Sequence, residues 1–347
     1  MLLMLSCSQS ETKAPTEATA PVTSELASGK QPQVAVSPDG VARLVYGDGE
    51  KIYYTTSKDN GTTFSEPVLV DSLKGLYLGM SMGPQIASSA HYSVLTAIDK
   101  KGNIHSYRLD HATDTWKKTA GVNDVAGTVP EGLISIAADD QDNFYAVWLD
   151  VRDDKKNKIA FASTTGGSDT WSANRIVYVS PDKTVCECCK PDIEVKDNQV
   201  ALMFRNWLNG SRDFYFTRSA DKGENFTTPQ KLGEGTWKLE GCPMDGGDLL
   251  LDNKNALHTV WQREGKIFYA QPGEKEKSLG EGRNVRIAGT TKPVMTWNND
   301  SEVKLKYLND DSVISVGQGS YAEPVELADK SKLIVWENEG KVYFRKI

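Results

Sequence analysis

Short runs of alternating apolar and polar residues recur along the chain from residue 32 onward, with β-branched and aromatic residues at the apolar positions. Each run is followed by a second one, and Gly, Asn and Asp separate the two. Alternation with a period of two residues predicts strands, and turn residues between two such runs predict a hairpin. Seven hairpins are found in this way, and their first strands begin near residues 42, 92, 144, 200, 257, 293 and 333.

A strand-rich unit that repeats every ~35–57 residues is typical of the blades of a β-propeller. We therefore expect a single all-β domain over residues 32–347, a propeller with seven blades by the hairpin count or with six blades and an irregular extra hairpin. The last hairpin lacks a fourth strand. Residues 20–23 are the candidate to supply it, because a closed ring leaves no exposed sheet edges.

Two loops share the pattern S-x-D-x-G-x-x-F. Its residues are Ser57, Asp59, Gly61 and Phe64 in the first loop, and Ser219, Asp221, Gly223 and Phe226 in the second. In such a turn the carboxylate and hydroxyl bond backbone amides, Gly takes an unusual φ, and the aromatic ring packs between strands. The pattern resembles the Asp-box of the sialidase-like (BNR-repeat) propellers. That resemblance implies turns between the third and fourth strands of a blade, away from any ligand site.

Loops between the second and third strands of a blade share one face of a propeller with the connections between blades. We expect the unusual residues of this chain on that face, in residues 79–85, 130–132, 150–154, 186–191, 205–213, 235–247 and 262–264. Three stretches resemble a bacterial subgroup of sialidase-like propellers often labelled exo-α-sialidase, and these are residues 186–191, 204–213 and 241–247. The resemblance covers most of residues 32–347.

A retaining sialidase clamps a carboxylate with three arginines and uses a Tyr nucleophile and acidic residues. The resemblance to this family therefore implies a set of candidate catalytic residues. They are Arg152, Asp153, Arg205, Arg212, Arg263 and Glu240, with Glu131 as the alternative to Glu240. The Arg-Ile-Pro motif of the family's first blade is absent, which leaves open whether the protein is an enzyme. For each arginine the alternative is an ion pair between blades.

Four cysteines are predicted to form one cluster on two neighbouring blade connections, and they are Cys186, Cys188, Cys189 and Cys242. A disulfide from Cys242 to one of the other three is one hypothesis, since adjacent Cys188 and Cys189 bridge only as a strained ring. A metal site is the second, because thiolates with Met80, Met82 and Met244 form a soft set suited to Cu(I) or Zn(II). A redox thiol is the third. No other cofactor is expected.

The N-terminal residues predict an anchor. Residues 1–7 are apolar and end in Leu5-Ser6-Cys7, which resembles a bacterial lipoprotein box with Cys7 as the lipidated residue. Residues 8–31 are rich in Ser, Thr, Ala, Pro and Glu and lack aromatics, which predicts a flexible tether. These features place the protein outside the cytoplasm on a cell envelope, in the outer membrane of a Gram-negative bacterium. A cytosolic protein with a free Cys7 is the alternative.

The net charge and the lengths of the apolar runs limit the classes of partner that we expect. The formal net charge of −7 argues against a nucleic-acid binder, which needs a basic face for phosphates. No apolar run approaches the ~20 residues that span a bilayer, so a membrane is expected as a partner only through the lipid. We expect a monomer that acts on or binds a glycan, or another small polar ligand, through its Arg-rich face. The alternative is a non-catalytic surface protein whose Cys/Met cluster is structural or binds metal.

Overall fold

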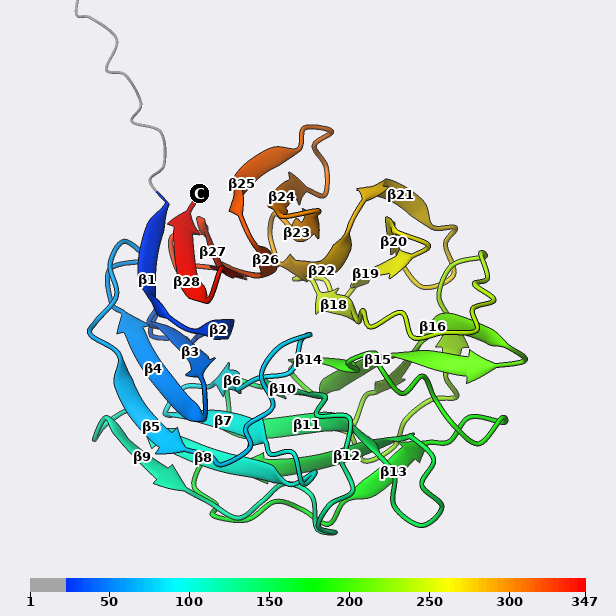
Figure 1. Cartoon of the computed structure of the whole chain (residues 1–347), viewed down its shortest axis with the longest axis horizontal. Helices are drawn as coiled ribbons and strands as arrows, with labels where there is room; N and C mark the ends of the chain where they lie inside the picture. The colour runs from blue at the N-terminus through cyan, green and yellow to red at the C-terminus, as the bar shows by residue number, and fades with distance from the viewer. Residues whose placement is uncertain (1–22) are drawn as a thin grey trace, which may run out of the picture.

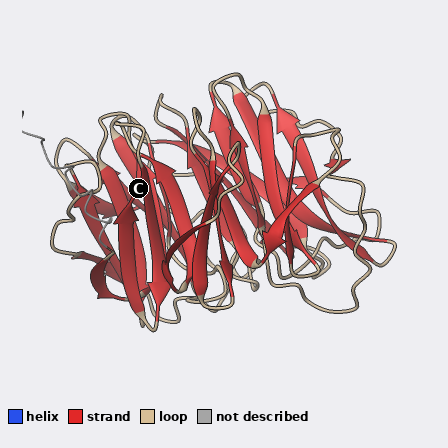
Figure 2. Ribbon diagram, turned by 90° about the horizontal axis from the view of Figure 1, so that it is seen from above, coloured by secondary structure: helices blue, strands red, loops and turns tan. Residues whose placement is uncertain are grey.

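The computed structural model describes residues 23–347, and every regular element in this range is a strand (Figure 2). Seven four-stranded antiparallel sheets stand around a central axis, as Figure 1 shows. The prediction of an all-β propeller is confirmed, with seven blades rather than six. Across the described residues no helix is long and apolar enough to cross a membrane.

Each blade runs outward from the axis through four strands. Blade 1 contains β2 (Lys30–Val36), β3 (Ala42–Asp48), β4 (Lys51–Ser57) and β5 (Val68–Ser72). Blade 2 contains β6 (Gln85–Ser88), β7 (Tyr92–Ile98), β8 (Ile104–Asp110) and β9 (Thr115–Lys118). Blade 3 contains β10 (Ile134–Ala138), β11 (Asn143–Asp150), β12 (Lys158–Thr165) and β13 (Arg175–Tyr178). Blade 4 contains β14 (Asp192–Lys196), β15 (Gln199–Leu208), β16 (Ser211–Ser219) and β17 (Gln230–Lys231).

The remaining blades follow the same order. Blade 5 contains β18 (Gly247–Leu251), β19 (Leu257–Arg263), β20 (Lys266–Ala270) and β21 (Lys277–Glu281). Blade 6 contains β22 (Arg283–Ala288), β23 (Val294–Asn299), β24 (Glu302–Tyr307) and β25 (Ile314–Gln318). Blade 7 contains β26 (Ser320–Glu326), β27 (Lys332–Asn338), β28 (Lys341–Lys346) and, as its outer strand, β1 (Ser24–Ser28).

A strand from the N-terminal part of the chain closes the ring, but it is not the predicted one. The closing strand is β1, whose Ser24 pairs with Phe344 and whose Ser28 pairs with Lys341 of β28. The predicted tether therefore extends too far, because residues 24–28 belong to β1 and residues 30–31 to β2. Leu26 packs against the core between blades 7 and 1, which holds this polar segment in place. Residues 1–22 lie outside the described residues, and they include Cys7 and all but Thr23 of the strand predicted at 20–23.

Hydrophobic side chains fill the space between neighbouring blades. Between blades 3 and 4, for example, Tyr145 and Phe161 belong to one buried cluster with Leu202 and Phe204. Strand alternation puts such residues on both sheet faces, so each blade is covered on two sides by its neighbours. The burial of apolar surface between blades therefore joins adjacent blades into one domain.

Charged side chains link the innermost strands around the axis. The Asp192 carboxylate of β14 accepts a hydrogen bond from the Leu249 amide of β18 at 3.2 Å. Further along the ring, Arg286 of β22 donates to Glu323 of β26 at 3.0 Å. Burial, together with the charge of Asp192, raises the pKa of Asp248 well above its usual range. Buried polar groups at the axis are thus paired from one blade to the next.

The two Asp-box turns fold as their residues predict. The Ser57 hydroxyl donates to Asp59 at 2.8 Å and accepts the Gly61 amide at 2.9 Å, and Gly61 has a φ of 72°. In the second turn the Ser219 hydroxyl likewise donates to Asp221 at 2.6 Å and accepts the Gly223 amide at 2.8 Å. The Phe rings contact Phe344 and Phe161 of neighbouring strands. Both turns join the third and fourth strands of their blades.

Candidate functional site

Two cavities lie on the face formed by the connections between blades, opposite the Asp-box turns. The first, which we call the sulfur pocket, has a volume of about 210 Å³, and its lining residues are Tyr77, Met80, Met82, Pro130, Glu131, Leu133, Cys188 and Met244. The second, the polar pocket, has a volume of about 390 Å³ and is lined by Met80, Met244, Arg283, Asn284, Asn298, Asp300, Ser320 and Tyr321. Met80 and Met244 belong to both, so the two cavities adjoin.

A repeated backbone feature shapes the polar pocket. The innermost strands of blades 1, 6 and 7 begin after a glycine with φ near 150°, and these glycines are Gly29, Gly282 and Gly319. A Cβ on Gly319 would lie 2.6 Å from the Trp336 ring, and one on Gly282 would lie 2.4 Å from the Trp297 ring. No side chain fits there. Two residues after each glycine the chain turns to positive φ, which brings Asn284 and Tyr321 to the loop face.

Hydrogen bonds fix the side chains of the polar pocket. Asn284 Nδ2 donates to Asn298 Oδ1 at 2.8 Å, and Asn298 Nδ2 donates to the Asp300 carbonyl at 3.2 Å. Tyr321 of blade 7 lines the same cavity as Met80 of the connection from blade 1 to blade 2. Arg283 remains half exposed. The pocket thus presents amide, guanidinium, carboxylate and phenol groups, and hydrogen bonds between the lining residues fix the positions of the amides.

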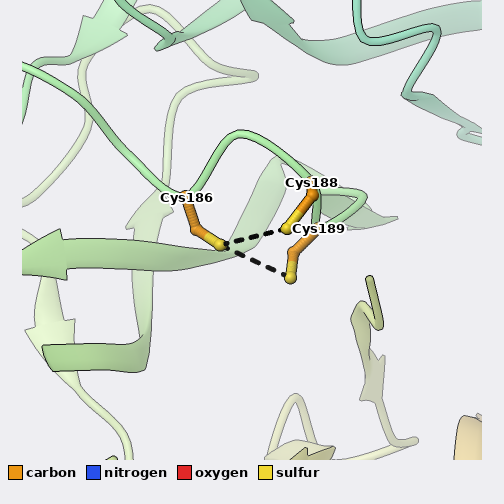
Figure 3. A group of neighbouring side chains, drawn as sticks. All are labelled: Cys186, Cys188 and Cys189. Atoms are coloured by element: carbon orange, nitrogen blue, oxygen red, sulfur yellow. Dashed lines mark hydrogen bonds between the residues drawn. The ribbon is translucent and has the colours of Figure 1, made fainter. Parts of the chain in front are cut away.

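The cysteines form the predicted cluster at the side of the sulfur pocket. A disulfide joins Cys188 to Cys242, with the two Cα atoms 6.1 Å apart, while Cys186 and Cys189 are buried free thiols. In Figure 3 the Cys186 sulfur points between the other two, at 3.8 Å from Cys188 Sγ and 3.6 Å from Cys189 Sγ. The prediction of a disulfide between Cys242 and one of the other three is confirmed.

The thiols lie beside two arginines. Arg212 Nη1 donates to Cys186 Sγ at 3.0 Å and forms an ion pair with Glu187 at 3.1 Å. Burial opposes ionisation of Cys189, but the hydrogen bond from Cys186, the charge of Arg205 and the Asp245 amide lower its pKa to about 7. The hydrogen bond to Cys189 and burial raise the pKa of Cys186. The two free thiols are therefore hydrogen-bonded to each other, with Cys186 as the donor, and lie beside two guanidinium groups.

The predicted catalytic arginines are engaged within the fold. Arg205 is 2% exposed and donates to the carbonyls of Arg212, Asp245 and Gln262. Arg205, Arg212 and Arg263 do approach one another between blades 4 and 5, but the crevice they line has no room for a water molecule. Arg263 pairs with Glu276 at 2.8 Å. Arg152 lies elsewhere, paired with Asp150 at 2.8 Å and with Asp124 at 3.1 Å.

These contacts hold each arginine inside the fold, but the predicted ion pairs between blades account for only part of them, since Arg263 pairs with Glu276 of its own blade and Arg205 donates to backbone carbonyls. A carboxylate clamp made of the four has no support in the geometry, since each guanidinium is mostly buried and already bonded. The predicted acids are also outside both pockets: Asp153 and Glu240 are exposed loop residues. Glu131 does line the sulfur pocket, and burial raises its pKa.

Sequence reasoning missed the side chains of the polar pocket, and these are Arg283, Asn284, Asn298, Asp300, Ser320 and Tyr321. A signal for part of the set is present in the chain. The segments 29–31, 282–284 and 319–321 each begin with Gly directly before an innermost strand, and each has a polar or aromatic residue two positions later.

Comparisons with known proteins establish the fold and no more. No protein-family model matches the chain, and no curated protein matches it in sequence. An α-L-arabinanase of Penicillium chrysogenum, solved with arabinobiose, has a TM-score of 0.58 and 13% identity over 94% of this chain and 97% of that one. An α-L-arabinofuranosidase of Fusarium graminearum, solved with an iminosugar inhibitor, has a TM-score of 0.52 and 12% identity over 94% and 97%. A Dyadobacter fermentans protein of unknown function has a TM-score of 0.53 and 13% identity over 93% and 95%.

Proposed function

We propose that the protein binds carbohydrate in the polar pocket and does not hydrolyse it. The observation that supports this is the 390 Å³ cavity, which opens on the loop face and holds four kinds of polar side chain around Tyr321. Ligand pockets commonly have volumes of about 300–1,000 Å³ with a few convergent polar groups. Similar folds carry sugar ligands, since the arabinanase was solved with arabinobiose.

The chemistry of the lining residues suits sugar hydroxyls. A hydroxyl both donates and accepts, so it pairs well with amides, carboxylates and guanidinium groups held in fixed positions. Asn298 and Asp300 are connected to each other, and Arg283 is anchored by its hydrogen bond to the Pro243 carbonyl at 2.7 Å. Such prior ordering reduces the entropy lost on binding.

The carboxylates do not favour hydrolysis. Glycosidases usually place two carboxyl groups on either side of the bond that breaks. The polar pocket has one, Asp300, whereas Glu131 belongs to the sulfur pocket. The predicted arginine clamp is engaged elsewhere, as described above. Binding is therefore the function that this geometry supports best.

Calorimetric titration with arabino-oligosaccharides and sialosides tests the proposal. Asp300→Asn keeps the shape and the positive φ of 52°, which Asn tolerates, but removes the charge. We expect it to weaken binding by about tenfold, the cost of a hydrogen bond to a charged group. Lys58→Ala, in a cavity on the opposite face, is the matched control and should bind as the native chain does.

Three results would contradict the proposal. The first is an equal loss in Asp300→Asn and Lys58→Ala, and the second is no binding of any sugar by the native chain. The third is turnover of a fluorogenic arabinofuranoside or sialoside by the native chain that Asp300→Asn abolishes, since the pocket would then be catalytic.

We also propose a location on the cell envelope, with Cys7 as the lipidated residue. The Cys188–Cys242 disulfide supports an oxidising compartment, because such bonds are rare in the cytosol. Labelling of expressing cells with a palmitate analogue should mark the full-length protein. Retention of the label by Cys7→Ala would contradict the assignment.

A further inference from the structure

The sulfur atoms at the side of the sulfur pocket have the spacing of metal ligands. Cys186, Cys188 and Cys189 have their Sγ atoms within 4.8 Å of one another, and the two pairs that include Cys186 are 3.6 and 3.8 Å apart. A metal bound at 2.3 Å by thiolates separates them by about 3.8 Å in tetrahedral and by about 4.0 Å in trigonal geometry. The three sulfurs therefore need to move little to share one ion (Figure 3).

The surroundings of the sulfurs favour negative charge. Arg212 donates to Cys186 Sγ at 3.0 Å, and Cys186 in turn donates to Cys189 Sγ at 3.6 Å. Two free thiols buried only for packing have no need of a guanidinium partner, and a buried guanidinium is costly to desolvate. A cation directed at sulfur stabilises a bound thiolate.

Two methionines stand at the mouth of the same pocket in costly conformations. Met80 and Met244 are 50% and 40% exposed, and their φ angles are 54° and 51°. An apolar side chain gains little free energy at such exposure, and positive φ disfavours residues other than Gly, Asn and Asp. Neither burial nor backbone preference therefore accounts for Met at these two positions. The shared property is a thioether, a soft ligand that selects Cu(I).

We propose that the reduced form of the protein binds one Cu(I) ion through Cys186, Cys188 and Cys189, and that Met80 and Met244 admit the ion to this site. The Cys188–Cys242 disulfide withholds one ligand, so the oxidised form lacks the site. The three sulfur ligands lie outside the polar pocket, so the metal site is distinct from the sugar site and shares only the entry residues Met80 and Met244 with it.

The chemistry of switching between the two forms balances with one named reactant. A protein dithiol reduces Cys188–Cys242 with two electrons and two protons and becomes a disulfide itself. Cu(I) then displaces one proton from each thiol that binds it. Arg212, in contact with Cys186, offsets the negative charge that remains on the complex.

Competition with a chromophoric Cu(I) chelator tests the site on the full-length chain under anaerobic conditions. In protein expressed without lipidation, thiol counts after denaturation should give three, namely Cys7, Cys186 and Cys189, and five after reduction. The reduced protein should withdraw one equivalent of Cu(I), and the oxidised protein should bind at least about 100-fold more weakly. Cys7→Ser is the matched control and should not alter either result.

Different variants test the roles of the cysteine ligands and of the two methionines at the pocket mouth. Cys186→Ser and Cys189→Ser should each weaken Cu(I) binding by more than about 100-fold, with folding checked by thermal unfolding. The double variant Met80→Leu, Met244→Leu should still bind one equivalent but acquire it at least tenfold more slowly. Equal Cu(I) binding by the oxidised and reduced protein would overturn the proposal without any variant. Uptake of Zn(II) but not Cu(I) by the reduced protein would overturn it as well.

Discussion

The two faces of the propeller use polar residues in different ways. On the Asp-box face the turns are held mainly by local hydrogen bonds: Asp59 accepts from the amides of Thr62 and Thr63, three and four residues away. On the loop face the partners are distant, as in the contact of Arg212 with Cys186, 26 residues away. Local pairing makes a turn that can be recognised in sequence. Pairing between blades makes a surface where side chains from several connections meet.

Because of this difference, polar residues of the Asp-box turns stabilise the fold, whereas those of the loop face can also bind a ligand. Hydrogen bonds from Thr63, Ser57 and the local amides lower the pKa of Asp59 to about 2, so its charge serves the turn. The loop face instead brings together Arg283, Asp300 and the sulfurs around two cavities, where some of these groups remain accessible to a ligand. Substitutions on the loop face should therefore affect both stability and binding, and those in an Asp-box turn stability alone.

The largest effect is expected from Arg205→Ala. This change leaves three buried carbonyls without their donor, and breaking such a buried network typically costs about 3–5 kcal/mol of unfolding free energy. Urea denaturation measures the loss. The unfolding free energy of Arg205→Lys, which keeps the charge but has fewer donors, should lie between those of the native chain and Arg205→Ala. A loss below about 1 kcal/mol would mean that the hydrogen bonds of Arg205 to the three carbonyls contribute little to stability.

Removal of the disulfide should have the next largest effect. Cys242→Ser opens a covalent link between residues 54 positions apart, and a disulfide usually contributes about 2–4 kcal/mol. Unfolding in oxidising buffer, compared with the native chain, gives the value. In strong reductant the native chain should fall to the stability of the variant, and a persistent gap there would contradict a purely cross-linking role.

Glu276 offers a pH-dependent test of a contact shared between blade 5 and the connection before it. Burial opposes its charge, but the amides of Glu234 and Gly235 and the Arg263 guanidinium lower its pKa to about 2. Since the folded pKa lies below that of the unfolded chain, the stabilisation is present above about pH 4.5 and is lost as pH falls toward 2. Glu276→Gln should cost about 2 kcal/mol at pH 7 and little near pH 2. Urea titrations at both pH values provide the check, and a loss independent of pH would exclude the charge as its cause.

The smallest effect is expected in the Asp-box turn. Asp59→Ala removes hydrogen bonds like those of a helix cap, which are worth about 1 kcal/mol. Thermal and urea unfolding measure it, and calorimetry with the sugar ligand should show unchanged affinity. A change in sugar affinity would show that residues of the Asp-box face also contribute to binding.

Much of the fold could be predicted from the sequence because its signals are local. Alternation along each strand indicated seven blades, and the S-x-D-x-G-x-x-F pattern indicated both turns. The closing strand was placed a few residues too early, because β1 has the sequence SELAS and lacks a clear alternation. Its partner β28 is also distant in the chain.

The site was less predictable because its residues depend on distant partners. The cysteines could be grouped from their position on neighbouring connections, and Cys188–Cys242 agrees with that. The arginines could not be assigned, since their engagement depends on carbonyls and carboxylates such as Gln262 and Glu276, which no spacing rule connects with them. The polar pocket was missed because Asn298 and Tyr321 belong to different blades.

The pairing of β1 with β28 has a consequence for how the chain is made. The ion pair of Glu25 with Lys341 joins residues 316 positions apart, so the earliest described strand can pair only after nearly the whole chain exists. At about 5–20 residues per second, the ribosome needs about 15–60 s to supply the partner. During that interval blade 7 cannot form and the ring remains open at one seam. A chain that terminates early is thereby left with an unpaired strand at its beginning, and such a strand edge is prone to pair with other chains.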